Sequence, residues 1–263
     1  MSELTAGMVI SRDHIVISDF NFAKPLTIGL LASRAKHNGL VVTGFEGPLA
    51  TFLSRIGYFS FLGVLDPFHL HRRNNLGTLE ITDASNDFCP EIDQVYDQVR
   101  TLLHGYPNLR SIEQVLAELI TNIKLHSEGL GLVVGQVIRE VFILAVVDNG
   151  VGVRRALSID PKYAHMDERQ LIELSVQKGV GNGRGRGWGL WIASEIAKRG
   201  NGNILVGSGN YVHSTDARGT FRIPHWQGTF IEWKFNLGAP VINWTPGQDD
   251  ASEVRNDEND FFS

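Results

Sequence analysis

The stretch VFILAVVDNGVGV, residues Val141–Val153, is the most informative part of this chain for both fold and function. Its apolar run from Val141 to Val147 predicts a buried strand, which places Asp148 at the strand end. The glycines that follow allow the backbone to come close to a flat or phosphorylated ligand. Taken alone, Asn149-Gly150 also suits a hairpin turn, because Asn-Gly is the commonest two-residue hairpin signal.

Composition narrows the class of protein. The 263 residues are 43% hydrophobic and 20% charged, which suits two small globular domains or one large one. The net charge of -5 gives no electrostatic case for a nucleic-acid or membrane partner. Cys89 is the only cysteine, so neither an internal disulfide nor a thiolate zinc site can form, which fits a reducing compartment. Because no apolar run has transmembrane length and no signal-peptide pattern opens the chain, the sequence predicts a cytoplasmic protein.

Strand and helix patterns divide the chain into two domains and a tail. Residues 1–77 alternate the two patterns, which predicts a small α/β domain of βαβα plan, loosely similar to a STAS domain. Its predicted elements are Met8–Ile10, His14–Ser18, Pro25–Lys36, Gly39–Phe45 and Pro48–Ile56. Residues 247–263 contain six acidic residues, a composition that predicts a disordered, solvated tail.

Residues 78–246 predict a larger α+β domain. Its predicted helices are Pro90–Leu103, Arg110–Ser127 and Gly189–Arg199, with a further short helix near Glu168–Gln177. Its predicted strands are Thr78–Asp83, Gly131–Arg139, Val141–Val147, Asn203–Gly207, Gly219–Ile223 and Thr229–Phe235. Ser111 is the predicted N-cap of the long helix.

Glu118 and Asn122 are the first candidate site residues, on the long predicted helix. Spaced i and i+4, they project from one helix face, and His126 continues on the side of Asn122. Polar residues on such a helix usually mark its solvated side. The pairing also suits chemistry, because a carboxylate can orient a water while an amide oxygen ligates Mg²⁺.

A second candidate is the loop GVGNGRGRGWGL, residues Gly179–Leu190, which leads into a predicted helix. Glycines before a helix N-terminus form an anion site, since free N–H groups and the helix dipole face the ligand. Arg184 and Arg186 add charge that matches phosphate. A flexible linker has a similar composition. The Walker lysine pattern is absent, and no short strand feeds the loop as in a Rossmann fingerprint.

The order of four motifs resembles the GHKL ATP-binding superfamily, which includes gyrase and MutL ATPase domains, heat-shock chaperones, histidine kinases and anti-sigma-factor serine kinases. The motifs are AELITNIKLH, VVDNGVG, GRGWGL and GTF, the last at Gly228–Phe230, within roughly residues 80–236. Their style is most similar to the anti-sigma-factor type. The resemblance implies an α/β sandwich with a mixed sheet and helices on one face, and it implies ATP and Mg²⁺ as cofactors.

The resemblance also implies a role for each matched residue. Glu118 would be the base, Asn122 the Mg²⁺ ligand, and Asp148 the acceptor for the adenine amino group. The other matched residues are Gly150 and Gly152 beside the base, Gly185, Gly187 and Gly189 at the phosphates, and Thr229 near the adenine end. Residues 153–186 would form a lid that closes over ATP. Trp188 departs from the motif. Its side chain could either pack at the start of the helix or stack on a ligand.

Two functions of different class follow. The first is an intracellular regulatory protein that binds Mg-ATP and hydrolyses it, or phosphorylates a protein on serine or threonine. The second is an ATP-dependent interaction switch that needs no chemistry. A histidine kinase fits less well, because residues 1–110 lack long paired heptads with a phospho-accepting histidine. The protein partner and the oligomeric state, a homodimer included, stay open.

Overall fold

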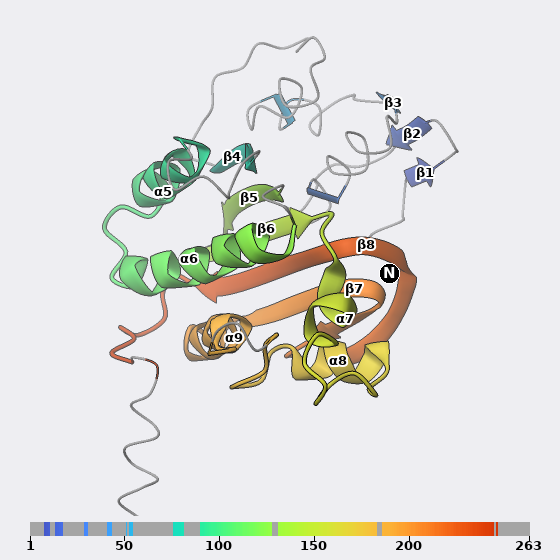
Figure 1. Ribbon diagram of the computed structural model, residues 1–263. Helices are drawn as coiled ribbons and strands as arrows, with labels where there is room; N and C mark the ends of the chain where they lie inside the picture. Colours follow the sequence, from blue (N-terminus) through green and yellow to red (C-terminus); the bar gives the residue numbers. More distant parts are fainter. Residues whose placement is uncertain are drawn as a thin grey trace, which may run out of the picture.

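A five-stranded antiparallel sheet is the centre of the fold in this computed structural model (Figure 1). The structure describes residues 8–10, 14–17, 29–30, 41–43, 51, 53–54, 76–81, 90–127, 131–182, 186–244 and 246. The sheet strands are β4 (Leu76–Ile81), β5 (Gly131–Ile138), β6 (Val141–Asp148), β7 (Asn203–Ser214) and β8 (Gly219–Asn236), in the order β4-β5-β6-β8-β7. The chain is thus an α+β protein. The expected mixed sheet is wrong for this domain, because every described pairing in it is antiparallel.

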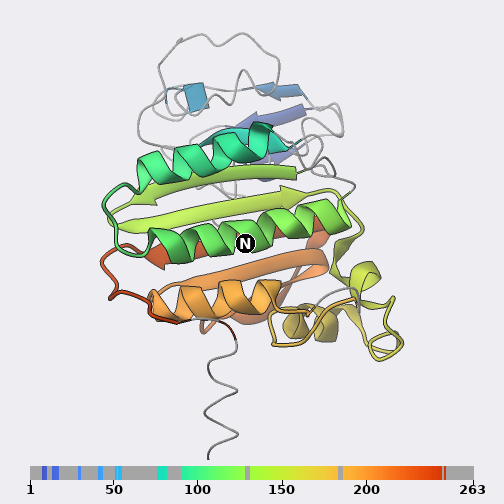
Figure 2. The ribbon, with the colours of Figure 1, turned by 60° about the vertical axis from the view of Figure 1, so that its left-hand side comes forward.

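Three helices form a single layer on one face of this sheet (Figure 2). They are α5 (Pro90–Leu102), α6 (Leu109–His126) and α9 (Gly189–Arg199), and each matches a helix predicted from apolar spacing to within a residue or two. Between the helices and the sheet lies the main apolar core, which includes Phe142, Leu144 and the fully buried Trp233. The Trp233 indole nitrogen donates to the Ala193 carbonyl of α9 at 2.8 Å, which fixes that helix on the sheet.

Strand β6 is buried on both of its faces. Alternating residues Phe142, Leu144 and Val146 contact the helix side, while Ile143, Ala145 and Val147 are buried on the other side. On that second face, a Cβ atom built on Gly29 would lie 3.0 Å from Val147 Cγ2, so the short helical segment at 29–30 packs there. A central strand covered on both faces explains why its sequence is an uninterrupted apolar run.

The N-terminal part contributes a small separate sheet of β1 (Met8–Ile10), β2 (His14–Ile17) and β3 (Val41–Thr43). Strands β1 and β2 are antiparallel, and β2 and β3 are parallel. Helical residues at 29–30, 51 and 53–54 fall inside the two helices predicted for this part. The rest of those helices and the acidic tail lie outside the described residues, and the STAS-like plan stays a prediction.

Strands β7 and β8 form one long hairpin that curls back on itself (Figure 1). The pairing shifts register around Gly209, which has a φ of +58°, and beyond this bend the hairpin continues to its turn at 215–218. The Thr215 amide donates to the Ile204 carbonyl at 3.0 Å, and the Thr215 hydroxyl accepts from the Ile204 amide at 3.1 Å. The hairpin turn therefore returns to the start of β7. The two strands predicted at 219–223 and 229–235 are one continuous strand.

Two short helices pack against the curled hairpin. Helix α7 (Gly152–Leu157) follows β6 directly, and α8 (Glu168–Leu174) begins at Asp167, whose side chain accepts from the Gln170 amide in a capping box. Since β6 leads into α7, the hairpin-turn alternative for Asn149-Gly150 is wrong. The predicted N-cap Ser111 is also wrong, because α6 begins earlier, after Asn108.

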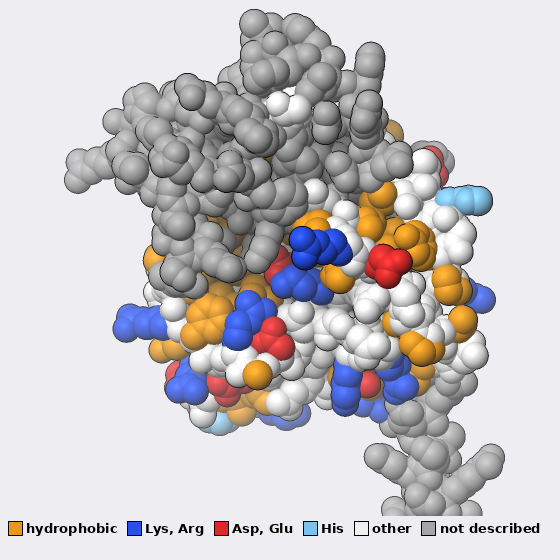
Figure 3. Space-filling view, turned by 180° about the vertical axis from the view of Figure 1, so that it is seen from behind, with side chains coloured by type: hydrophobic (Ala, Val, Ile, Leu, Met, Phe, Trp, Pro, Cys, Tyr) orange, Lys and Arg blue, Asp and Glu red, His pale blue; other side chains and the backbone are white. Residues whose placement is uncertain are grey.

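Seen from behind, basic and acidic side chains are interspersed on the described part of the surface (Figure 3). On this face, the part of the surface that the structure describes shows no large area of one sign. Among the described residues, no helix has both the length and the apolar character needed to cross a bilayer.

Candidate functional site

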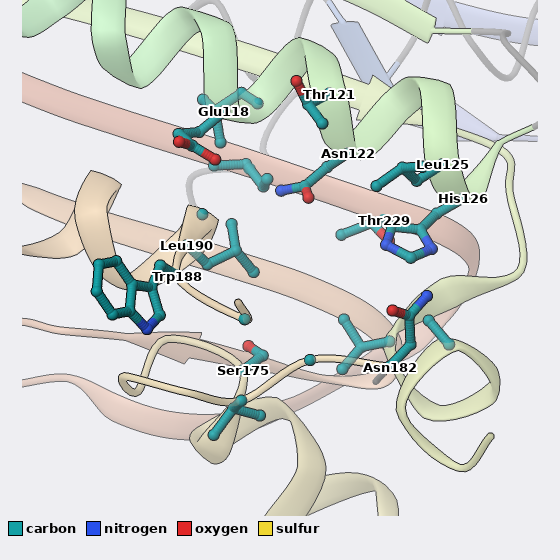
Figure 4. Close-up of a pocket in the computed structure, with 18 of the residues that line it drawn as sticks. Glu118, Thr121, Asn122, Leu125, His126, Ser175, Asn182, Trp188, Leu190 and Thr229 are labelled. Atoms are coloured by element: carbon teal, nitrogen blue, oxygen red, sulfur yellow. The ribbon is translucent and has the colours of Figure 1, made fainter. Parts of the chain in front are cut away.

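A cavity of about 570 Å³ opens between α6, the end of β6, the middle of β8 and the start of α9. Figure 4 shows Glu118, Asn122 and His126 extending into it from α6, with Trp188 and Leu190 at the start of α9 across from them. Eight predicted site residues lie on its wall: Glu118, Asn122, Asp148, Gly152, Arg186, Gly187, Gly189 and Thr229. Gly150 does not line the cavity, and Arg184 and Gly185 lie outside the described residues.

Asp148 lies at the inner end of the cavity, where β6 stops. Its side chain is buried, and its Oδ1 accepts hydrogen bonds from the Gly150 amide at 2.8 Å and the Thr229 amide at 3.1 Å. Burial raises the pKa of this carboxyl to about 6, against the two amide hydrogen bonds, which lower it. Since both of these bonds use Oδ1, Oδ2 is the oxygen available to accept from a ligand N–H group.

Glycines bring three backbone segments together around Asp148. A Cβ on Gly228, which has a φ of +87°, would overlap the Asp148 carbonyl oxygen, so only glycine allows β8 to approach the end of β6 so closely. Gly152 has a φ of +74°, and its Cβ would lie 2.7 Å from Ser208 Oγ. That hydroxyl donates to the Gly228 carbonyl at 2.8 Å and accepts from the Val153 amide at 3.0 Å. The buried Ser208 thus joins the bend of the hairpin to the start of α7.

Gly150 connects the Asp148 turn to the end of α6. A Cβ at this position would overlap the His126 carbonyl oxygen, and the same carbonyl accepts from the Val151 amide at 2.9 Å. The structure therefore gives Gly150 a packing role, and its predicted position beside a base stays a prediction. This contact holds the helix that bears Glu118 and Asn122 against the strand end that bears Asp148.

Glu118 and Asn122 form the other side of the cavity, next to the start of α9. A Cβ on Gly189 would lie 3.0 Å from Glu118 Oε2 and 3.7 Å from Asn122 Oδ1, so a glycine here gives both polar groups access to the α9 N-terminus. Burial raises the pKa of the Glu118 carboxyl above its ordinary value. An acid with a raised pKa is a stronger base when ionised, and the amides of an 11-residue helix face the same space.

The predicted lid is only partly a loop. Residues 152–174 include α7 and α8, whose side chains Leu157, Leu171 and Ile172 are buried in the core. The first half of the lid predicted over 153–186 is thus packed helix that lines the cavity in part, and closure over a ligand stays a prediction. From Ser175 to Gly187, several described residues line the cavity, among them Val180 and Asn182, and these are placed to cover a ligand (Figure 4).

Of the two roles considered for Trp188, packing at the start of the helix agrees with the structure. Trp188 holds the N-cap position of α9 and contacts Trp191 edge to face, with ring centroids 5.8 Å apart. Lys178 Nζ lies 5.5 Å and Arg186 Cζ 5.4 Å from the centre of the Trp188 ring. Trp188 therefore holds two cations at the mouth of the cavity, which is an electrostatic match for phosphate.

Several residues of the site were not predicted from the sequence. Ser208, Gly228 and Lys178 all help to shape it, and of these Ser208 and Lys178 belong to no recognisable local motif. A signal existed for Gly228, in the GTF motif, where only Thr229 had been assigned a role. Searches against protein-family models, curated proteins and solved structures find no match for this chain.

Proposed function

We propose that this chain is a GHKL-type Mg-ATP-binding regulatory protein that hydrolyses ATP, or transfers its γ-phosphoryl group to a serine or threonine of a partner protein. The observation that supports this most is a cavity that has Asp148 at one end and Glu118, Asn122 and the α9 N-terminus at the other. Its volume of about 570 Å³ lies in the range of about 300–1,000 Å³ usual for small-molecule sites.

At the inner end, the proposal assigns adenine to Asp148. Oδ2 would accept from the exocyclic amino group, and the ring would lie beside Gly152, which lines the same cavity. The ribose would then lie toward the middle of the cavity. The triphosphate would extend to α9, where helix amides and Arg186 supply positive charge.

Magnesium fits the donor set at the phosphate end. The described residues contain no cluster of three or more His, Cys, Asp or Glu side chains that could enclose a metal. Mg²⁺ commonly needs only one or two protein oxygens and takes the rest from substrate phosphates and water. Asn122 Oδ1 would supply such an oxygen, and the ion would neutralise charge on the phosphates.

Glu118 would act as the base in this scheme. Its carboxylate removes a proton from water or from an acceptor hydroxyl, the oxygen attacks the γ-phosphorus, and the bond to ADP breaks. The raised pKa of Glu118 suits this role, because the proton is held more firmly as it is transferred. Amides of α9 and Arg186 would stabilise the charge on the transferred group.

Calorimetric titration of the wild type with ATP and ADP in the presence of Mg²⁺ tests the binding part. Failure of both nucleotides to bind would end the proposal. Phosphate release by Glu118→Gln then tests the chemistry, with an expected fall of about 10²–10⁴-fold and retained ATP binding. Glu113→Gln is the matched control, because Glu113 lies on the same helix but pairs with Arg100 at 2.6 Å.

Binding without turnover, with and without candidate protein partners, would instead favour the interaction switch. The described segment from Ser175 to Asn182 gives that alternative a structural basis, since a ligand in the cavity would contact it directly. Cytoplasmic location and the absence of nucleic-acid and membrane partners remain part of the proposal.

A further inference from the structure

Three tryptophans form a continuous aromatic row from the mouth of the cavity along α9. Trp188 contacts Trp191 at 5.8 Å between centroids, and Trp191 contacts Trp244 at 5.5 Å. We call this row, together with the cations on it, the aromatic rim. Lys178 Nζ lies 5.0 Å from the Trp191 ring, in addition to its contact with Trp188.

Two arginines extend the positive charge of the rim at either end. Arg186 lies over Trp188 beside the cavity, and Arg199 Cζ lies 4.9 Å from the Trp244 ring. Arg199 also pairs with Glu195 at 3.7 Å, so Lys178 and Arg186 contribute most of the positive charge of the rim. The aromatic rings hold these side chains on the surface of the protein, since Lys178, Arg186 and Arg199 are all exposed. The rim is thus an ordered cationic surface that continues beyond the cavity.

The same rim anchors the chain just before its acidic segment. Trp244 is buried, and Pro246 lies on the wall of the cavity itself. Residues 247–260 follow immediately and contain six acidic side chains and one basic one. Asp249 and Asp250 come three and four residues after Pro246, so an extended chain reaches about 10–14 Å from it. That reach begins at a residue that itself lines the cavity.

We propose that residues 247–260 dock on the aromatic rim of their own chain and compete there with the polyphosphate of a bound nucleotide. Each exposed ion pair is weak, but a short tether gives an effective concentration on the order of millimolar. Glu118 on the inner wall repels acidic side chains, so the segment covers the rim and not α6. The docking is argued from the residues of the aromatic rim alone, whereas the competition also rests on the proposed function, ATP binding.

Disulfide trapping in the full chain tests the docking without any nucleotide. In a Cys89→Ser background, Gln177→Cys is combined with Ser252→Cys, because Gln177 is exposed beside Lys178. The control pair is Gln94→Cys with Ser252→Cys, since Gln94 is exposed on α5 at the other end of the helical layer (Figure 2). With oxidised glutathione we expect the first pair to cross-link at least ten times faster, and high salt to remove most of the difference. Equal rates for the two pairs would overturn the docking.

Nucleotide affinity tests the competition. Asp249→Asn with Asp250→Asn should tighten ATP binding about fivefold or more, with a smaller effect for ADP, which carries less charge. Asp93→Asn with Glu140→Gln removes the same charge from exposed sites elsewhere and should leave affinity unchanged. An equal gain in the control pair would attribute the effect to net charge and overturn the competition. Cross-linking at Gln177 in a protein that binds no nucleotide would keep the docking and reject only the proposed function.

Discussion

Asp148→Asn should make the folded protein more stable at neutral pH while it weakens nucleotide binding. Burial raises the pKa of Asp148 from an ordinary value of 3.8 to about 6, so the folded state binds this proton more tightly than the unfolded state does. A group with a raised pKa contributes stability that is fully present below 3.8 and is lost as the pH rises through about 6. The ionised carboxylate therefore opposes folding at neutral pH.

The pKa values set the size of this effect. The difference between 3.8 and about 6 corresponds to about 3 kcal/mol at pH 7.5. Asparagine avoids that penalty and keeps an Oδ1 acceptor for the amides of Gly150 and Thr229. We expect Asp148→Asn to raise the free energy of unfolding by up to about 3 kcal/mol at pH 7.5, and by only about 1 kcal/mol at pH 4.5.

Urea denaturation of both proteins between pH 4.5 and pH 8 measures the difference. Asp93→Asn is the control, because Asp93 is exposed on α5 and its loss should change stability little. In the variant, an amide N–H₂ would face the adenine amino group, so ATP affinity should fall about 10–100-fold. A variant that is less stable than the wild type at pH 7.5, or a difference independent of pH, would refute the reasoning.

Three other positions give sharp tests by urea unfolding. Gly150→Ala places a methyl group against the His126 carbonyl and should lose about 2 kcal/mol or more, while Gly105→Ala, whose methyl meets no atom within 4 Å, should lose only about 1 kcal/mol. Ser208→Ala leaves a buried amide without its acceptor, so a loss of about 1–3 kcal/mol is expected, and no loss would contradict the assigned hydrogen bond. Asn108→Ala removes three hydrogen bonds to residues 239–242, and both lower stability and faster proteolysis of the C-terminal segment should follow.

Periodicity predicted the helical layer and the central strands well, because these elements are buried in simple patterns. The stripe of α6 and the apolar run of β6 each depend only on which residues face the core. The positions of Glu118, Asn122 and Asp148 on one cavity follow from those elements once the sheet is assembled. Apolar periodicity does not indicate the direction in which neighbouring strands run, so the antiparallel sheet could not be distinguished from a mixed one.

The short helix α8 was predicted near its observed position, but the continuous hairpin and helix α7 were missed because local signals disagree with the tertiary structure. The two strands predicted at 219–223 and 229–235 leave out Pro224 and Gly228, yet β8 continues through both, since the pairing shifts register in that region. Helix α7 begins at a glycine with a φ of +74° and has only six residues, too few for a periodic pattern. Asn108 holds the N-cap position of α6, but its side chain binds residues 239–242 instead of capping the helix.

The return of Thr215 to Ile204 restricts how copies of this protein can assemble. An edge strand with free amides and carbonyls invites pairing with a strand of another molecule. In β7 the amide and carbonyl of Ile204 are already bonded to the turn of their own hairpin, and Asn203 Nδ2 donates to Asp216 at 3.2 Å beside them. A continuous intermolecular sheet cannot begin at this point without uncurling the hairpin. A pair of molecules that extended this sheet edge to edge would instead have the opposite edge, at β4, to pair through.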